Sequence, residues 1–133
     1  MWLAHPFVHA RVCVPPLTRA QVYITDMDTI EKSNLSRQFL FRSSDIGLAK
    51  SISAANKAKE MNVDMNITAF EEKMCGETEA QFGDAFFDSL TGVCNALDNV
   101  HARLYMDGRV MFYQLPLYES GTLGTKGNVQ VRH

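Results

Sequence analysis

The sequence lacks a strong excess of charge of one sign, a long hydrophobic run and a framework of paired cysteines. Its 133 residues carry 13 Lys and Arg against 15 Asp and Glu, so the basic face that nonspecific nucleic-acid binding requires is not expected. No apolar run approaches the roughly 18 residues of a membrane span, and residues 1–14 lack the positive leading region of a signal peptide. Cys13, Cys75 and Cys94 are odd in number and widely spaced, which suits a reducing compartment. We therefore expect one soluble domain with no nucleic-acid or membrane partner.

Glycine is absent from residues 1–21, a stretch that carries Pro6, Pro15 and Pro16 instead. The consecutive prolines exclude a continuous helix or a central strand there, and neither a period of 2 nor one of 3.6 residues can be traced. We expect residues 1–21 to be a poorly structured lead-in and residues 22–133 to form the domain.

Strand and helix patterns alternate from residue 22 onward. Short apolar or β-branched runs predict strands, and apolar residues recurring at helical spacing predict helices. The predicted strands are residues 22–26, 65–69, 92–97, 115–118 and 128–131, and the predicted helices are a segment capped by Ser43, Ser44 or Asp45 that runs to about residue 61, residues 82–90, and residues 100–111. Such alternation is typical of βαβ units and favours an α/β fold with a parallel sheet flanked by helices.

The three predicted helices each have apolar residues at a spacing that would bury one face. We expect the first to bury a stripe of Ile52, Ala55, Ala58 and Met61, the second an aromatic face of Phe82, Phe86 and Phe87, and the third a face with Val100, Leu104 and Met111.

Acidic residues follow two of the predicted strands. Asp26 or Asp28 follows the first, and Asp98 follows the strand at 92–97. In open parallel sheets, ligands bind beyond the carboxyl ends of the strands. An acidic side chain after an early strand can accept hydrogen bonds from ribose hydroxyls, and one after a later strand can hold Mg²⁺ through oxygen. Asp is also common as a helix cap or turn residue, so both interpretations stay open from the residues alone.

Two cations, Arg37 and Lys50, are positioned to contact a phosphate. The guanidinium group of Arg offers a planar fork for two oxygens, whereas Lys acts as a mobile point charge. Lys50 falls in the first turn of a predicted helix, where the helix dipole disfavours a cation. This position is a weak indication of a function, because either residue alone is more often a solvated surface charge.

Three motifs, taken together, resemble one family. They are ITDMDTIEKSNLSRQFLFR at residues 24–42, NALDNVHARLYMD at 95–107 and ESGTLGTKGNVQV at 119–131. The chain is similar over about residues 22–131 to the adenylation half of ubiquitin-activating enzymes, within the wider family of ThiF/MoeB-like adenylation domains. The resemblance implies a Rossmann-like sheet, ATP and Mg²⁺ as cofactors, ubiquitin as a partner, and a location in cytoplasm and nucleus.

The resemblance also assigns roles to individual residues. It implies that Asp26 contacts the nucleotide ribose and that Asp98 binds Mg²⁺. The remaining matched positions lie at the phosphates or elsewhere along the nucleotide: Asn34, Arg37, Gln38, Lys50 and Asn99. It further implies catalytic roles for Arg37, Lys50 and Asp98, because ubiquitin's C-terminal carboxylate and ATP are both anionic and need cations to bring them together.

The sequence departs from the family pattern in one respect. The family begins this domain with a strand and a glycine-rich turn, and residues 1–21 contain no glycine. We therefore expect a fragment that lacks its first strand, has an unpaired strand edge and is separate from the catalytic-cysteine domain. Two alternatives stay open: an inactive remnant that binds ubiquitin or a partner such as the remaining enzyme domains, and, less favoured, an NAD-dependent oxidoreductase.

Overall fold

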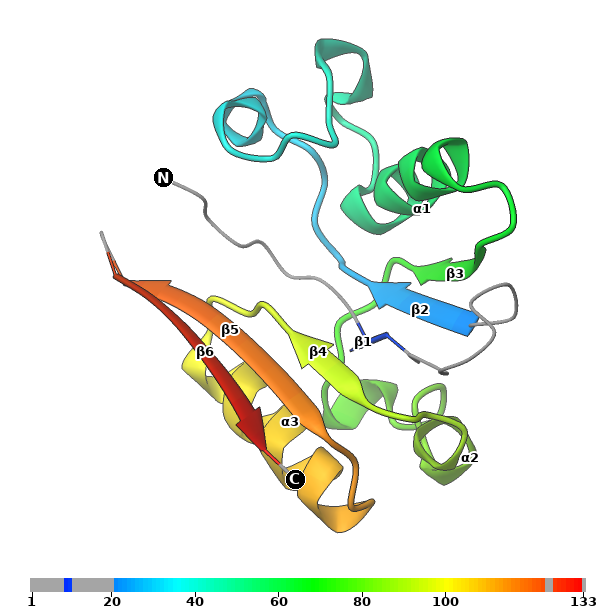
Figure 1. Cartoon of the computed structure of the whole chain (residues 1–133), viewed down its shortest axis with the longest axis vertical. Coiled ribbons are helices and arrows are strands. Elements are labelled where there is room, and N and C mark those ends of the chain that lie inside the picture. The colour runs from blue at the N-terminus through cyan, green and yellow to red at the C-terminus, as the bar shows by residue number, and fades with distance from the viewer. Residues whose placement is uncertain (1–8, 11–20, 124–125, 133) are drawn as a thin grey trace.

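The computed structural model describes residues 9–10, 21–123 and 126–132, which form two three-stranded sheets flanked by helices (Figure 1). The strands are β1 (His9–Ala10), β2 (Gln21–Thr25), β3 (Asn66–Phe70), β4 (Val93–Asn95), β5 (Leu117–Leu123) and β6 (Lys126–Arg132). The helices are α1 (Lys50–Met61), α2 (Asp84–Asp88) and α3 (Val100–Phe112), with 3₁₀ turns at Lys32–Ser36, Ser43–Asp45 and Gly76–Thr78. The predicted α/β fold is confirmed. Nowhere in these ranges is a helix both long and apolar enough to span a bilayer.

The first sheet is built on a parallel pair, β2 and β3, in which Ile24 lies opposite Ala69. The crossover helix α1 packs on this pair through Ala55, which is buried together with Ile24 and Ile67. The short strand β1 runs antiparallel along the other edge of β2, beside Val22. The order of the sheet is therefore β1-β2-β3.

The second sheet repeats the parallel arrangement with β4 and β5, connected by α3. Val93 of β4 lies opposite Leu117 of β5, and both are buried against Met106 and Val110 of α3. β6 then returns antiparallel along β5 and is exposed over its whole length. β5 starts at Leu117, after Pro116, and extends to Leu123, further than the predicted 115–118, because β6 pairs with all of it.

The sheet is divided between β2 and β4, and of the described residues the two of β1 lie between them (Figure 1). β1 is antiparallel to β2 and forms a ladder with that strand, and among the described residues β4 forms a ladder with β5 alone. The expected lack of a first parallel strand stays a prediction, because the structure does not describe all of residues 1–21. Of the predicted lead-in, residues 1–8 and 11–20 lie outside the described residues, while His9–Ala10 forms β1 and Gln21 begins β2.

Aromatic side chains connect the two sheets. Tyr23 of β2 meets Phe86 edge to face with ring centroids 5.2 Å apart, and Phe70 of β3 meets Phe82 in the same way at 5.3 Å. Phe82 and Phe87 are buried in the same cluster as the core residues of β4, β5 and α3. The aromatic face predicted for residues 82–90 therefore exists, although α2 itself spans only Asp84–Asp88.

The first helix begins later than predicted. Ser43–Asp45 forms a separate 3₁₀ turn, and α1 starts at Lys50. Gly47 lies between them with φ of +88°, a left-handed conformation that glycine adopts without steric cost and that interrupts the helical path.

The apolar stripe predicted for α1 is only partly buried, and the one predicted for α3 is exposed. On α1, Ala55 is buried and Ala58 half-buried, but Ile52 is exposed and Met61 is 68% exposed, because the contact with β2 and β3 is made by small residues on the adjoining face. On α3 the predicted face is wrong, because the helix turns Met106 and Val110 toward the sheet. Val100, Leu104 and Met111 are exposed.

Phe87 provides the test of the core. Phe87→Ala should lower the free energy of unfolding by about 3–5 kcal/mol, because the ring is fully buried and its removal leaves a cavity. Urea denaturation followed by circular dichroism measures this change. Phe112→Ala on α3, where the ring is 76% exposed, is the matched control and should change the free energy by no more than about 0.5 kcal/mol. Equal losses in the two variants would contradict this core.

Candidate nucleotide site at the strand ends

The carboxyl ends of β2, β3 and β4 enclose a cavity of about 170 Å³. Asp26 and Asp28 reach it from the end of β2, and Asp98 and Asn99 reach it from the loop after β4. The structure therefore gathers three of the seven predicted site residues, Asp26, Asp98 and Asn99, at one end of the fold. A larger cavity of about 540 Å³ between α3 and the β5–β6 hairpin is lined by none of the seven.

Asp26 is held at the end of β2, with only 7% of its surface exposed. Its Oδ1 accepts a hydrogen bond of 2.9 Å from the backbone amide of Asp28. Burial raises the pKa of Asp26 from 3.8 to about 6, although the Asp28 amide and the positive charge of Lys50 lower it in part. At neutral pH the side chain is thus a mostly ionised acceptor that is poorly solvated and open to a hydroxyl donor.

Lys50 is the first residue of α1, and its side chain is 6% exposed. Its Nζ lies 2.7 Å from Oδ2 of Asp28, and its backbone amide donates to the Asp28 carbonyl oxygen at 2.9 Å. These contacts fix the start of α1 against the loop after β2. A buried cation at a helix N-terminus is unfavourable by itself, and the carboxylate of Asp28 offsets that cost.

Asn34, Arg37 and Gln38 belong to the 3₁₀ turn at Lys32–Ser36 and the residues after it, and they do not line the cavity. Asn34 is buried, and its Oδ1 accepts from the backbone amide of Glu31 at 2.9 Å. Arg37 donates from Nη1 to the carbonyl oxygen of Ser33 at 2.8 Å. Gln38 is buried with neither amide atom paired to any residue that the structure describes.

Asp98 and Asn99 connect β4 to α3 and are both exposed. Asn99 is the N-cap of α3, where its Oδ1 accepts from the amides of His101 at 2.8 Å and Ala102 at 3.3 Å. Asp98 lies directly before this cap. The capping role that the sequence left open for Asp98 thus belongs to Asn99, and the Asp98 carboxylate is used in no helix cap.

Within the described ranges, no group of three or more His, Cys, Asp or Glu residues is arranged to hold a metal ion. Mg²⁺ commonly takes only one or two protein carboxylates and completes its shell with phosphate and water oxygens. A single carboxylate from Asp98 at the mouth of the cavity suits Mg²⁺ that is shared with phosphate and water. One carboxylate is too few for a metal held by protein ligands alone.

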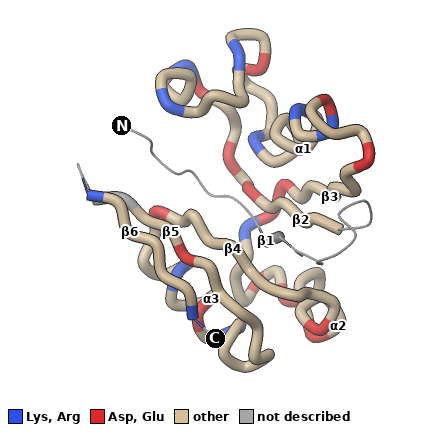
Figure 2. Tube along the Cα trace, in the orientation of Figure 1, with Lys and Arg blue, Asp and Glu red and all other residues tan. Residues whose placement is uncertain are grey.

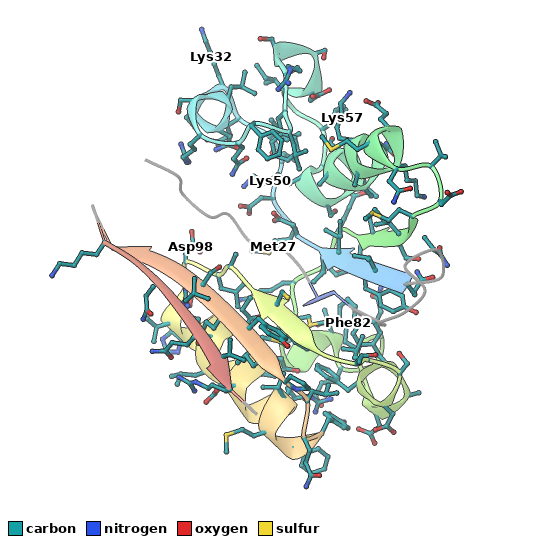
Figure 3. The ribbon with its side chains drawn as sticks, viewed as in Figure 1. Met27, Lys32, Lys50, Lys57, Phe82 and Asp98 are labelled. Carbon is teal, nitrogen blue, oxygen red and sulfur yellow. The ribbon has the colours of Figure 1, made fainter. Side chains whose placement is uncertain are left out.

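One lining residue, Asn95, escaped the sequence reasoning. It is the last residue of β4, is 3% exposed, and has an amide Nδ2 without a partner among the described residues. The signal was present in the sequence, since Asn95 is the one side chain in the run GVCNAL that needs hydrogen-bond partners on burial. Figure 3 shows Met27, Lys50 and Asp98 around the ends of β2 and β4, and Figure 2 shows the acidic segment that follows β2.

Comparison with known proteins gives a consistent result. The model of the ThiF family matches residues 18–133. The chain is 62% identical over 110 residues to ubiquitin-like modifier-activating enzyme 1 of Dictyostelium discoideum, covering 83% of this chain and 11% of the relative. It is 55% identical over 111 residues to the Homo sapiens protein of the same name (84% and 10%), and 54% identical over 112 residues to ubiquitin-activating enzyme E1 1 of Schizosaccharomyces pombe (83% and 11%). The chain thus spans about a tenth of the length of these relatives.

The raised pKa of Asp26 predicts a pH-dependent loss of stability. A carboxyl whose pKa is higher in the folded state stabilises the fold below the unfolded pKa near 4, and this contribution is lost as the pH rises through 6. Asp26→Asn removes this pH-dependent loss of stability and keeps a side-chain oxygen that can accept from the Asp28 amide. Its melting temperature should match the wild type below pH 4 and exceed it above pH 6.

Thermal melts between pH 3.5 and 8 measure the difference. Asp64→Asn is the control, because Asp64 is exposed, and its profile should follow the wild type. An Asp26→Asn profile parallel to the wild type at every pH would show that Asp26 titrates normally.

Proposed function

The chain belongs to the ThiF family, and on that premise we propose that it binds ATP with Mg²⁺ at the strand-end cavity and serves in the adenylation of ubiquitin. The observation that carries the proposal is the meeting of Asp26 and Asp98, from two different strands, around one cavity, with Lys50 adjoining it through Asp28. The names of the relatives described above support ubiquitin as the protein substrate. We also propose a cytoplasmic and nuclear location, which the resemblance to ubiquitin-activating enzymes implies.

We assign the ribose to Asp26. A carboxylate with little exposure and a single backbone donor retains free lone pairs, so it accepts well from paired hydroxyl groups. Its position at the end of an early strand is the one at which open α/β sheets commonly hold a ribose.

We assign the triphosphate to Lys50, Arg37, Asn34 and Gln38. Lys50 is already buried and ion-paired to Asp28, so a phosphate oxygen can replace the Asp28 carboxylate without first ordering the lysine. Gln38 has a buried amide whose two polar atoms have no partner among the described residues, so a ligand that donates or one that accepts a hydrogen bond can pair with it. Arg37 has its Nη1 on the Ser33 carbonyl, and its planar fork suits two phosphate oxygens.

We assign Mg²⁺ to Asp98. When bound there, the ion offsets the negative charge of the phosphates. The exposed carboxylate of Asp98 at the mouth of the cavity leaves space for the remaining water and phosphate ligands. Lys50 and Arg37 then hold the phosphates against the approaching carboxylate of ubiquitin.

The reaction is an adenylyl transfer, a substitution at phosphorus. An oxygen of ubiquitin's C-terminal carboxylate bonds to the α-phosphorus of ATP, and the bond from that phosphorus to the bridging oxygen breaks, so that the electron pair leaves with pyrophosphate. Positioning and charge neutralisation suffice for this step, and no side-chain nucleophile is required. Cys75 and Cys94 therefore have no role in it.

A melting experiment tests the nucleotide site. Mg-ATP at 100 times its Kd should stabilise the chain by about 2.7 kcal/mol, which is several degrees of melting temperature. ATP with a chelator, and NAD at the same concentration, should give little shift. Asp98→Asn should remove the metal-dependent part of the shift, whereas Asp88→Asn on α2, away from the cavity, should keep it. Stabilisation by NAD without metal would favour an oxidoreductase instead.

Pyrophosphate exchange tests the reaction itself. Ubiquitin-dependent exchange of labelled pyrophosphate into ATP should appear with the wild type and fall at least tenfold in Lys50→Gln, since that variant loses the buried charge. Nucleotide and ubiquitin binding without any exchange would instead identify the chain as a binding module that performs no turnover.

A further inference from the structure

Asn95 presents a buried amide donor to the strand-end cavity. The residue ends β4 and lies on the same face of the strand as Val93, which packs in the core. Its backbone carbonyl accepts from Oγ of Ser120 at 3.1 Å, so the main chain at this point is held from the neighbouring strand. The side-chain Nδ2, in contrast, has no partner among the described residues.

A buried donor without a partner is unfavourable, and native proteins leave few of them unsatisfied. An apolar residue of similar size at this position would avoid that cost, because Met74 and Met106 line the same cavity and supply apolar contacts. An amide in this place therefore indicates an acceptor that arrives with a ligand.

The lining of the cavity indicates which part of a nucleotide supplies the acceptor. Asp26, Asp28, Glu72 and Asp98 give it an acidic rim, with Lys73 as the one lining cation among the described residues. Phosphate without a bound cation is repelled by that rim, whereas an uncharged ring is not. The volume of about 170 Å³ is also smaller than the 300 Å³ or more of a pocket for a whole ligand, so it suits one part of the molecule.

We propose that Asn95 is a specificity-determining residue of this site, and that its Nδ2 donates a hydrogen bond to a ring nitrogen of the nucleotide base. The inference rests on the proposed function and adds the base to it. The ring lies between the apolar side chains of Met74 and Met106, with the ribose at Asp26 after the end of β2.

Purine analogues in which one ring nitrogen is replaced by carbon test the bond directly. Calorimetry with the full chain compares Mg-ATP with its 1-deaza, 3-deaza and 7-deaza analogues. One of the three should bind the wild type about tenfold more weakly than ATP does, the cost of leaving a buried donor unpaired. Asn95→Leu should bind ATP about tenfold more weakly, with no further loss for that analogue. The inference would be overturned if that analogue bound Asn95→Leu about tenfold more weakly than ATP does, as it binds the wild type. It would also be overturned if neither the analogue nor the variant lowered the affinity.

Two further measurements separate this role from a structural one. Without nucleotide, Asn95→Leu should melt at or above the wild-type temperature, since it removes an unpaired buried amide. A large drop in the melting temperature would identify Asn95 as a structural residue and overturn the inference. Asn95→Asp keeps the size of the side chain but loses the donor, so its affinity for Mg-ATP is an independent check. Asn66→Leu, at the exposed opposite end of β3, should bind every analogue as the wild type does.

The outcomes also separate the two proposals. Absence of Mg-ATP binding by the wild type overturns the proposed function and the role of Asn95 together. Wild-type binding that neither Asn95→Leu nor any deaza analogue weakens overturns the role of Asn95 alone and leaves the nucleotide site standing.

Discussion

Contacts between aromatic rings hold the two halves of this fold together. In the described residues no hydrogen-bonded ladder runs from β2 to β4, and the sheets meet through Tyr23 and Phe70 on one side and the rings of residues 82–87 on the other. The candidate site is built from strand ends of both sheets. Its geometry therefore depends on side-chain packing, which tolerates small changes in volume poorly, rather than on a continuous backbone sheet.

Asp28 links the charged residues of the site. Its amide donates to Asp26 and its carboxylate pairs with Lys50, so one residue with a half-exposed side chain satisfies a buried acid and a buried base. Each of these buried charges would be strongly destabilising alone. The loop after β2 consequently has a structural reason to keep its conformation in the absence of a ligand, and that conformation is the one that holds Lys50 ready for an anion.

Element types and the parallel pairs were predictable from the sequence, because β-branched runs and helical spacing reflect local burial. The burial of individual helix faces was not. α1 and α3 both carry apolar residues on more than one face, and which face packs is decided by the sheet: Ala55 rather than Ile52 on α1, and Met106 rather than Leu104 on α3. The late start of α1 depends on the positive φ of Gly47, which spacing alone does not reveal. The division of the sheet between β2 and β4 depends on which strands pair in the folded chain, which local sequence patterns do not reveal.

Prediction of the candidate site from the sequence has a similar limit. Asp26, Lys50 and Asp98 each had an ordinary alternative role when considered singly, and only their joint occurrence in three motifs favoured a nucleotide site. Asn95 belongs to the second of those motifs, yet no role was assigned to it, because a short apolar run hides one polar residue. The structure adds that Asn95 is buried at the cavity wall with a donor that has no partner among the described residues. A polar side chain inside an apolar strand is thus best judged by what pairs with it, and an unpaired one points toward a ligand.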